Sequence, residues 1–309
     1  MKRGLVVVLS ALLLAACGGG GGGGGDAGRA SSGVTVDTRF GPVTIEQPPK
    51  RVVALGWSDA ETALALGVQP VGASDWLAFG GKGVGPWAEG LYQQAPTLLG
   101  TTEVDYEAVA ALQPDLILNT RSDNDEKKHE TLSGIAPTIG APKDVIPYGT
   151  SWRQQVELVA KALGKVAEGE RIITDLDAKF AANRKFDGTT AVVGAYFDGK
   201  FGAYVSGDPR ADFMRAVGFT PRRDVEDLAS GTFYVDISAE RLDLLAADLT
   251  VLFPIGGDAA PLKGNPLVPE KALILEDENL VNAFSSGSSL GMAYALDHAV
   301  PLFSAALGR

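Results

Sequence analysis

Cysteine and histidine are scarce in this sequence of 309 residues, which has one cysteine and two histidines. A single cysteine excludes an internal disulfide, a cysteine-based zinc site and a pair of thiols for redox chemistry. The histidines, His129 and His298, lie far apart in the sequence, so no direct metal site is expected. His129 lies in a charged run and is predicted to be a solvated surface residue, and His298 is predicted to lie on the last helix.

Positive charge is also scarce. The chain has 27 basic and 38 acidic residues, a net charge of −11, and no block of Lys or Arg after Arg3. This balance excludes the basic surface that nucleic-acid binding needs, so no nucleic-acid partner is expected. The hydrophobic content of 45% is that of a globular protein, and the length favours two domains or one large one.

The N-terminus has the features of an exported protein. Two basic residues precede an apolar run over residues 5–16, as in a secretory signal peptide, and this run is too short to span a bilayer. It ends in Leu14-Ala15-Ala16-Cys17, which resembles the bacterial lipobox, where the cysteine is lipidated and becomes the new N-terminus. We expect a signal peptide over residues 1–16 and a palmitate-bearing Cys17 on the extracytoplasmic face of the cell membrane.

Residues 17–33 are predicted to be a tether. The glycine run over residues 18–25 and the polar segment after it can neither bury a core nor hold regular structure. The lipid anchor is therefore the one membrane contact that the sequence predicts.

Residues 34–150 alternate between strand and helix patterns, which favours a parallel α/β sheet. A leading hairpin is predicted over residues 34–45, around the turn Phe40-Gly41-Pro42. Strands and helices then alternate, with Gly67 ending the first helix, over residues 51–55, 59–66, 68–73, 106–112 and 115–118.

A helical connection is predicted over residues 151–186. Apolar residues recur there at helical spacing, and Gly164 and Gly169 are expected to divide the segment into two helices, the second one long. The βα alternation resumes over residues 187–309, with strands predicted at 191–196 and 249–253 and a helix at 212–217.

An internal repeat links the two halves. Glu107-x4-Leu112-x2-Asp115-Leu116 recurs as Glu240-x4-Leu245-x2-Asp248-Leu249, each time as a helix that leads into a strand. The pattern favours an α/β fold of two similar lobes with central, mostly parallel sheets, joined by a helical segment.

Three segments resemble the substrate-binding lipoproteins of ABC importers for iron-siderophore complexes, haem and cobalamin. They are residues 51–72, residues 106–118 with the pattern Leu-x-Pro-Asp-Leu-Ile, and residues 238–249, where Ala247 departs from Pro114 of the first copy. The resemblance implies a non-catalytic, monomeric receptor without a cofactor, with a long rigid helix joining the lobes and a ligand cleft between them. Such a receptor captures a ferric siderophore between its lobes and hands it to an ABC permease.

Ligands of open α/β sheets bind outside the carboxyl ends of the strands, so the loops there are expected to form the site. These loops are rich in aromatic residues, which suit a large amphipathic chelate. Trp87 and Trp152 are weaker candidates. The predicted ligand-binding residues are Trp57, Ser58, Trp76, Arg121, Tyr148, Tyr196, Tyr204, Arg210 and Tyr234.

The charge of the body bears on the ligand. An acidic body with few clustered arginines fits a neutral or cationic ferric hydroxamate better than a strongly anionic tricatecholate, which needs several positive donors. Haem and cobalamin remain alternatives within the same family.

Two glutamates are candidates for docking to the permease. The family has a glutamate in each lobe that pairs with permease arginines, and the resemblance carries this role to Glu61, in Asp59-Ala60-Glu61-Thr62, and to Glu240, in Ser238-Ala239-Glu240-Arg241.

An α/β-hydrolase is the enzymatic alternative, because residues 287–291 fit the G-x-S-x-G pattern with Ser289 as nucleophile. The residues after Gly291 offer only Asp297 beside His298, and neighbours on a helix do not face each other. The sequence therefore favours a binding protein over an enzyme.

Overall fold

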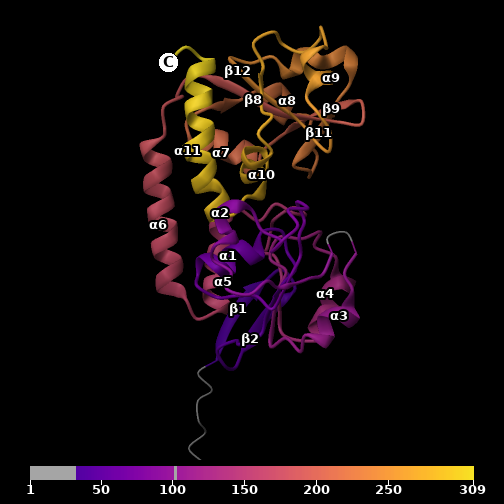
Figure 1. The fold of residues 1–309 in the computed structure, drawn as a ribbon, viewed down its shortest axis with the longest axis vertical. Coiled ribbons are helices and arrows are strands. Elements are labelled where there is room, and N and C mark those ends of the chain that lie inside the picture. Colours follow the sequence, from indigo (N-terminus) through magenta and orange to yellow (C-terminus); the bar gives the residue numbers. More distant parts are fainter. Residues whose placement is uncertain (1–32, 101–102) are drawn as a thin grey trace, which may run out of the picture. The chain divides into compact units, whose positions relative to one another are not determined.

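The computed structural model describes residues 33–100 and 103–309, and residues 33–309 form one compact unit. This unit is the body of the protein (Figure 1). It contains every hydrophobic core cluster of the described chain, so we expect it to fold without the preceding residues. The predicted signal peptide, the lipidation at Cys17 and the tether up to residue 32 lie outside the described residues.

The first lobe contains a hairpin and a parallel sheet, as predicted. The hairpin pairs β1 (Val34–Thr38) with β2 (Gly41–Ile45). The sheet has the order β5-β4-β3-β6-β7, and all its pairs are parallel. Its strands are β3 (Val52–Ala54), β4 (Gly72–Ala73), β5 (Thr97–Leu98), β6 (Leu116–Leu118) and β7 (Thr138–Ile139). The helices of this lobe are α1 (Asp59–Ala65), α2 (Pro86–Glu89), α3 (Tyr106–Ala111) and α4 (Glu126–Ser133).

The second lobe contains a mixed sheet. Its path is β11-β9-β8-β12-β13, and β10 pairs with β8. The strands are β8 (Thr190–Phe197), β9 (Lys200–Tyr204), β10 (Thr220–Pro221), β11 (Tyr234–Ile237), β12 (Leu249–Pro254) and β13 (Leu273–Ile274). Strands β9 and β11 are antiparallel to their neighbours, a feature that the sequence patterns did not predict.

Helices pack around this second sheet and form the last elements in chain order. They are α7 (Pro209–Ala216), α8 (Arg223–Glu226), α9 (Ala260–Lys263), α10 (Glu278–Ser286) and α11 (Ser289–Ala306), with the 3-10 helix η1 at Ala239–Leu245. His298 lies on α11, as predicted. Within the described residues, no helix has the length and apolarity needed to cross a membrane.

Two helices, α5 (Trp152–Ala162) and α6 (Val166–Ala182), connect the lobes (Figure 1). Ser151 and Gln154 form a capping box that starts α5, and Gly164, with a φ of 67°, lies in the turn between the helices. The prediction of two helices is confirmed, but Gly169 does not break the second one. It lies inside α6, where an added Cβ would come within 2.6 Å of the Ala160 Cβ, so glycine allows the two helices to pack closely.

The connecting helices are part of both cores. Val159 of α5 belongs to the core of the first lobe, whereas Leu176 and Phe180 of α6 belong to the core of the second lobe. Lys179 also fastens α6 to α11, because its Nζ donates to Asp297 Oδ2 at 2.7 Å. Each buried side chain of this size stabilises the fold by about 1.5–3 kcal/mol. The connection is therefore packed along its length rather than free to bend.

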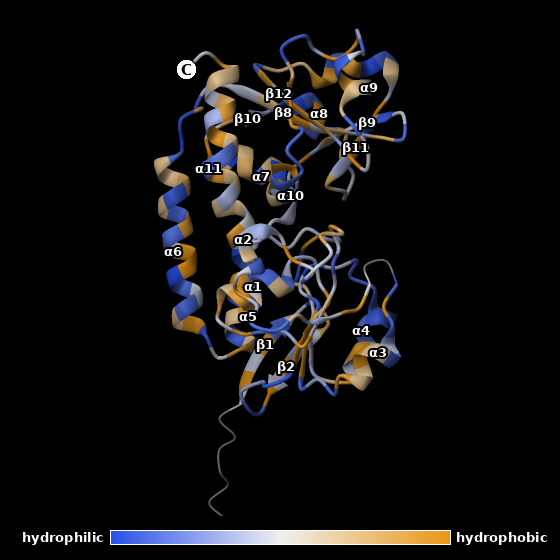
Figure 2. Ribbon diagram, in the orientation of Figure 1, coloured by the Kyte–Doolittle hydropathy of each residue, from blue (hydrophilic) through white to orange (hydrophobic). Residues whose placement is uncertain are grey.

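The prediction that His129 is a solvated surface residue is wrong. It lies on α4, where hydrophilic residues dominate (Figure 2), but its ring is buried and stacks on Phe40 at 4.0 Å between centroids. The charged sequence around it faces solvent on the other side of the helix, which is why the pattern alone predicted a solvated histidine.

Candidate functional site

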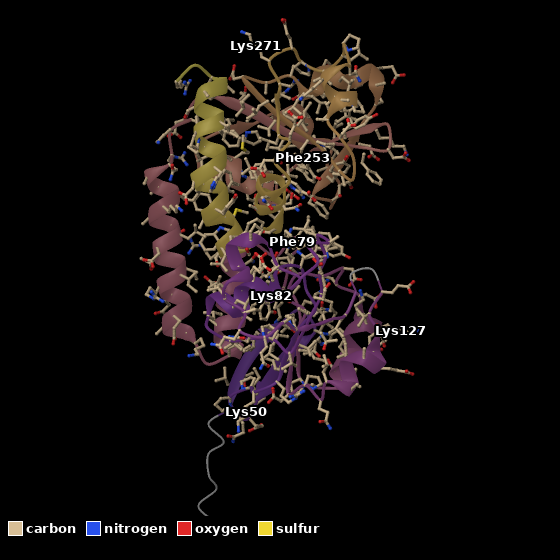
Figure 3. The ribbon with its side chains drawn as sticks, in the orientation of Figure 1. Lys50, Phe79, Lys82, Lys127, Phe253 and Lys271 are labelled. Carbon is tan, nitrogen blue, oxygen red and sulfur yellow. The ribbon has the colours of Figure 1, made fainter. Side chains whose placement is uncertain are left out.

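A cleft of about 1020 Å³ lies between the two lobes. Phe253 and Phe79, labelled in Figure 3, come from the sides of the lobes that face each other. The cleft is lined by the ends of strands and by α10, as expected for parallel α/β sheets. Its lining residues are Trp57, Trp76, Leu77, Ala78, Phe197, Tyr204, Arg210, Phe233, Tyr234, Phe253, Pro254, Ile255, Gly256, Gly257, Leu275, Glu276, Glu278, Val281, Asn282 and Ser285.

The first lobe contributes an aromatic platform, formed by Trp57, Trp76 and Tyr148. The rings of Trp57 and Trp76 stack at 4.2 Å with 7° between their planes, and Tyr148 stacks on Trp57 at 4.1 Å. Trp57 lies in the loop that follows β3, whereas Tyr148 comes from the loop before α5 and has a φ of 59°. The two tryptophans line the cleft, and Tyr148, which stacks on Trp57, lies edge-on to Phe233 of the second lobe at 6.4 Å.

Arg121 lies beneath this platform and does not line the cleft. Its side chain is 1% exposed, and its Cζ lies 5.6 Å from the ring centroids of both Trp57 and Trp76. Its Nε donates to Tyr148 O at 2.9 Å and its Nη1 donates to Ser286 O at 2.7 Å. Burial lowers the pKa of Arg121 to about 10, so the group stays charged at neutral pH. The arrangement makes Arg121 a support for the aromatic rings rather than a direct contact for a ligand.

The second lobe contributes a polar aromatic wall, formed by Tyr204, Arg210 and Tyr234. The Arg210 guanidinium lies 3.5 Å from the centroid of Tyr204, and Tyr204 meets Tyr234 edge-on at 5.1 Å. The Tyr234 ring fills the space beside Gly202, where a Cβ would come within 2.0 Å of the phenol. Strand β9 therefore needs a glycine at this position so that the wall can form.

The charge of Arg210 is balanced inside the wall. Its Nε and Nη2 donate to the Asp208 carboxylate at 2.8 and 2.7 Å, and its Nη1 donates to Ser285 Oγ at 3.0 Å. Asp208 is completely buried, so the pair is shielded from solvent. Among the described residues that line the cleft, Arg210 is the one cation, and the two carboxylates are Glu276 and Glu278. The cleft thus has no excess of positive charge.

Two further predicted residues lie away from the cleft. Ser58 is buried, and its Oγ donates to Ser286 O at 2.5 Å. Tyr196 packs on Phe201, at 5.0 Å between ring centroids, in the cluster on the opposite face of the second sheet. Because side chains alternate along a strand, the neighbouring Phe197 is the residue of β8 that reaches the cleft.

The sequence analysis did not predict four of the apolar residues with which the second lobe lines the cleft. Phe197, Phe253, Ile255 and Leu275 all line the cleft. The predicted strand over residues 249–253 was a usable signal, because the loop that follows a parallel strand lies at its carboxyl end. No comparable signal marks Leu275, since β13 before it has only two residues.

The prediction that Glu61 docks onto the permease is contradicted by its burial, because Glu61 is 3% exposed. Its carboxylate accepts hydrogen bonds from Trp87 Nε1 at 2.9 Å, from the Gly85 backbone N–H at 3.3 Å and from the Ser288 hydroxyl. Burial raises its pKa above the ordinary value, although these donors oppose the shift. Glu61 therefore joins α1 to the start of α11 and cannot dock onto another protein in this arrangement.

The turn between α10 and α11 also forms contacts between the two lobes. Ser286 O accepts from both Ser58 and Arg121, and Gly287 between the helices has a φ of 66°. A Cβ on Gly287 would lie 2.5 Å from Arg121 Nη1, so only glycine fits there without displacing the arginine. Hydrogen bonds at this turn therefore join the two lobes next to Ser285, which lines the cleft.

Glu240, the other predicted docking residue, is exposed on η1. The internal repeat places Glu107 at the matching position of the first lobe, and Glu107 is likewise exposed, on α3. The two glutamates are equivalent in sequence and are both accessible.

The geometry around Ser289 does not form a hydrolase triad. Ser289 is the first residue of α11 and follows α10 with no strand between them. His298 lies further along the same helix, roughly 13 Å away by helical rise, where its ring stacks on Tyr294 at 3.9 Å. Over residues 33–100 and 103–309, no group of three or more His, Cys, Asp or Glu side chains is placed to hold a metal ion.

Comparisons with known proteins agree with this architecture. A profile described as periplasmic binding protein matches residues 52–253. A curated relative, the probable siderophore-binding lipoprotein YfiY of Bacillus subtilis, is 30% identical over 225 residues, which cover 69% of this chain and 66% of the relative. The chain therefore spans slightly less than two thirds of the length of this relative.

Two solved structures are similar over most of the chain. The structure of Streptococcus pneumoniae PiaA in complex with ferrichrome is 26% identical with a TM-score of 0.78, over 89% of this chain and 99% of PiaA. A periplasmic solute binding protein of Mycobacterium smegmatis is 27% identical with a TM-score of 0.77, again over 89% and 99% of the two chains.

Proposed function

Because the chain belongs to the periplasmic binding protein family, we propose that it is a non-catalytic receptor that captures a ferric siderophore outside the cytoplasm and delivers it to an ABC permease. The observation that carries the proposal is the cleft between the lobes, with stacked tryptophans on one side and the Tyr204–Arg210 wall on the other. Flat aromatic walls with a few fixed polar groups suit a bulky metal chelate. The curated and structural relatives named for siderophores support the same class of ligand.

The charge of the cleft favours a ferric hydroxamate. Arg210 is neutralised by Asp208, and the other ionic groups that line the cleft are carboxylates. A tricatecholate complex carries several negative charges, and losing its hydration without positive partners is costly. A neutral or cationic hydroxamate complex avoids that cost, and the phenol hydroxyls of Tyr204 and Tyr234 in the cleft lining offer it donors.

The anchor and the tether complete the receptor. Cys17 would carry the lipid and residues 18–33 would let the body approach the permease from the extracytoplasmic face of the membrane. The name of the curated relative, a lipoprotein, supports this arrangement. We expect the receptor to act as a monomer.

Glu240 and Glu107 are the proposed docking residues for the permease. Both are exposed, one on each lobe, at equivalent positions of the repeat. A pair of carboxylates on the two lobes can engage a pair of permease arginines only when the body lies across the permease, which would fix the orientation of delivery.

A fluorescence titration of the body, residues 33–309, tests the proposal. Ferric hydroxamate is expected to quench Trp57 and Trp76 saturably, and the iron-free hydroxamate, ferric tricatecholate, haemin and cyanocobalamin are expected to bind at least tenfold more weakly. Preferential binding of haemin or cyanocobalamin would move the protein to a different ligand of the same family. Binding of none of these compounds, or ester hydrolysis that Ser289→Ala abolishes, would reject a siderophore receptor.

A further inference from the structure

Two large apolar side chains in the cleft are exposed to solvent. Phe197 is 56% exposed and Ile255 is 42% exposed, and both line the cleft. Single exposed apolar residues are common, but an apolar pair at the edge of a binding cleft marks a surface that a partner covers.

The two side chains lie next to each other on one face of the second sheet. Strands β8 and β12 are parallel, with Ala195 opposite Phe253, and the Ile255 N–H continues the ladder by donating to Tyr196 O at 2.9 Å. Since side chains alternate in direction along a strand, Phe197 and Ile255 point to the same face as the buried Phe253. Phe197 and Ile255 therefore form an apolar shelf in the lining of the cleft, next to the buried Phe253.

Nothing in the described structure covers the outer part of the shelf. Gly256 and Gly257 follow Ile255, and a Cβ on either residue would meet no atom within 4 Å. The lining residues Pro254 to Gly257 carry no charged side chain, and the Arg210–Asp208 pair lies on the wall formed by β9 and α7. The shelf is therefore apolar, open and continuous with the proposed chelate site.

We propose that the apolar shelf binds a hydrocarbon arm of the ligand, such as an acyl chain, while the metal-binding head lies between the platform and the Tyr204–Arg210 wall. This inference rests on the proposed function and assigns the ligand class as an amphiphilic ferric hydroxamate. Burial of an acyl chain against half-exposed Phe and Ile side chains is favourable in proportion to the apolar area removed from water. The cleft volume of about 1020 Å³ exceeds what most small ligands fill, which leaves room for such an arm.

The test uses two ligands that differ only in the arm. They are the ferric complexes of a linear trihydroxamate whose terminal amine carries either an acetyl or an octanoyl group, so both have the same charge. The body should bind the octanoyl complex at least tenfold more tightly than the acetyl complex. In the double variant Phe197→Asn/Ile255→Asn this ratio should fall below about threefold, because the octanoyl complex loses more affinity than the acetyl complex.

Leu267→Asn is the matched control, because Leu267 is also 56% exposed but does not line the cleft. It should keep the wild-type ratio. Equal affinities of the wild-type body for the two complexes would overturn the inference and leave the proposed function standing. Unchanged affinities in the double variant together with reduced uptake by cells would also overturn it, because the shelf would then contact the permease. If neither complex binds, the proposed function fails as well.

Discussion

The two sides of the cleft hold their ligand-facing groups by different means. On the first lobe, Trp57 and Trp76 stack on each other above the buried Arg121, whose donors are used by backbone carbonyls. On the second lobe, Tyr204 is held against Arg210, whose donors are used by the Asp208 carboxylate and Ser285. Each arginine orients aromatic rings, and neither extends an unpaired charge into the cleft. The comparison indicates a pre-formed site in which shape and aromatic surface select the ligand more than charge does.

The largest expected effect is on stability, at the ion pair that holds Arg210. Asp208→Ala leaves Arg210 as a buried charge without its partner, and we expect a loss of about 3–5 kcal/mol in the free energy of unfolding, measured with urea. Asp227→Ala, which removes the exposed partner of Arg223, should cost less than about 0.5 kcal/mol. A loss below about 1 kcal/mol for Asp208→Ala would mean that the wall does not depend on the ion pair.

The platform should dominate ligand affinity. Trp57→Ala removes a ring that stacks on both Trp76 and Tyr148, and we expect ferric hydroxamate affinity to fall by about 2 kcal/mol or more, roughly thirtyfold. Trp152→Phe is the control, because Trp152 packs against Phe180 and does not line the cleft. Isothermal titration calorimetry separates the two cases, and equal losses would show that the platform is not the binding surface.

Fold and site were predictable from sequence to different degrees. The strands over residues 191–196 and 249–253 and the helices on either side of Gly164 have clear hydrophobic patterns, and the structure confirms them. Trp57 and Trp76 were placed in the cleft lining because they follow the ends of strands, and the structure has both of them there. These features are local, so a single sequence contains them.

Long-range packing was not predictable. Glu61 lies on a helix whose residues from Asp59 to Leu64 are all buried, because the connecting helix α5 and α11 of the second lobe both pack against α1. Its partner Ser288 is far away in the sequence, and nothing in the pattern around Glu61 indicates that contact. Arg121 was misjudged for the same reason, since Ser286, which fixes it, belongs to the other lobe.

The buried carboxylate of Asp59 should give a pH dependence. Burial raises the pKa of Asp59 from 3.8 to about 6, although hydrogen bonds from Thr120 and Gln155 oppose the shift. The folded state then binds a proton more tightly than the unfolded state, so stability falls as pH rises from about 4 to about 6. The contribution lost is on the order of 2–3 kcal/mol.

Urea unfolding of the wild type and of Asp59→Asn at pH 4.5 and pH 7 measures this contribution. The variant should lose less stability than the wild type over that interval, whatever its absolute stability. Asp227→Asn, at an exposed carboxylate, should behave as the wild type. An unchanged pH dependence in Asp59→Asn would show that Asp59 does not titrate in this range.

The smallest effect on binding is expected at the proposed docking glutamates. Glu107→Lys and Glu240→Lys change exposed side chains that do not line the cleft, so ligand affinity should stay within about twofold of the wild type. Uptake of ferric hydroxamate by cells that carry the double variant should nevertheless be lost. Undiminished uptake would contradict the docking proposal.

A crystal structure of the body with a ferric hydroxamate, with the iron located by its anomalous scattering, tests the central claim most directly. We expect one iron peak in the cleft, between the Trp57–Trp76 stack and the Tyr204–Arg210 wall, with hydroxamate oxygens as its ligands. An iron peak outside the cleft, or one bound directly by side chains of the protein, would contradict the account.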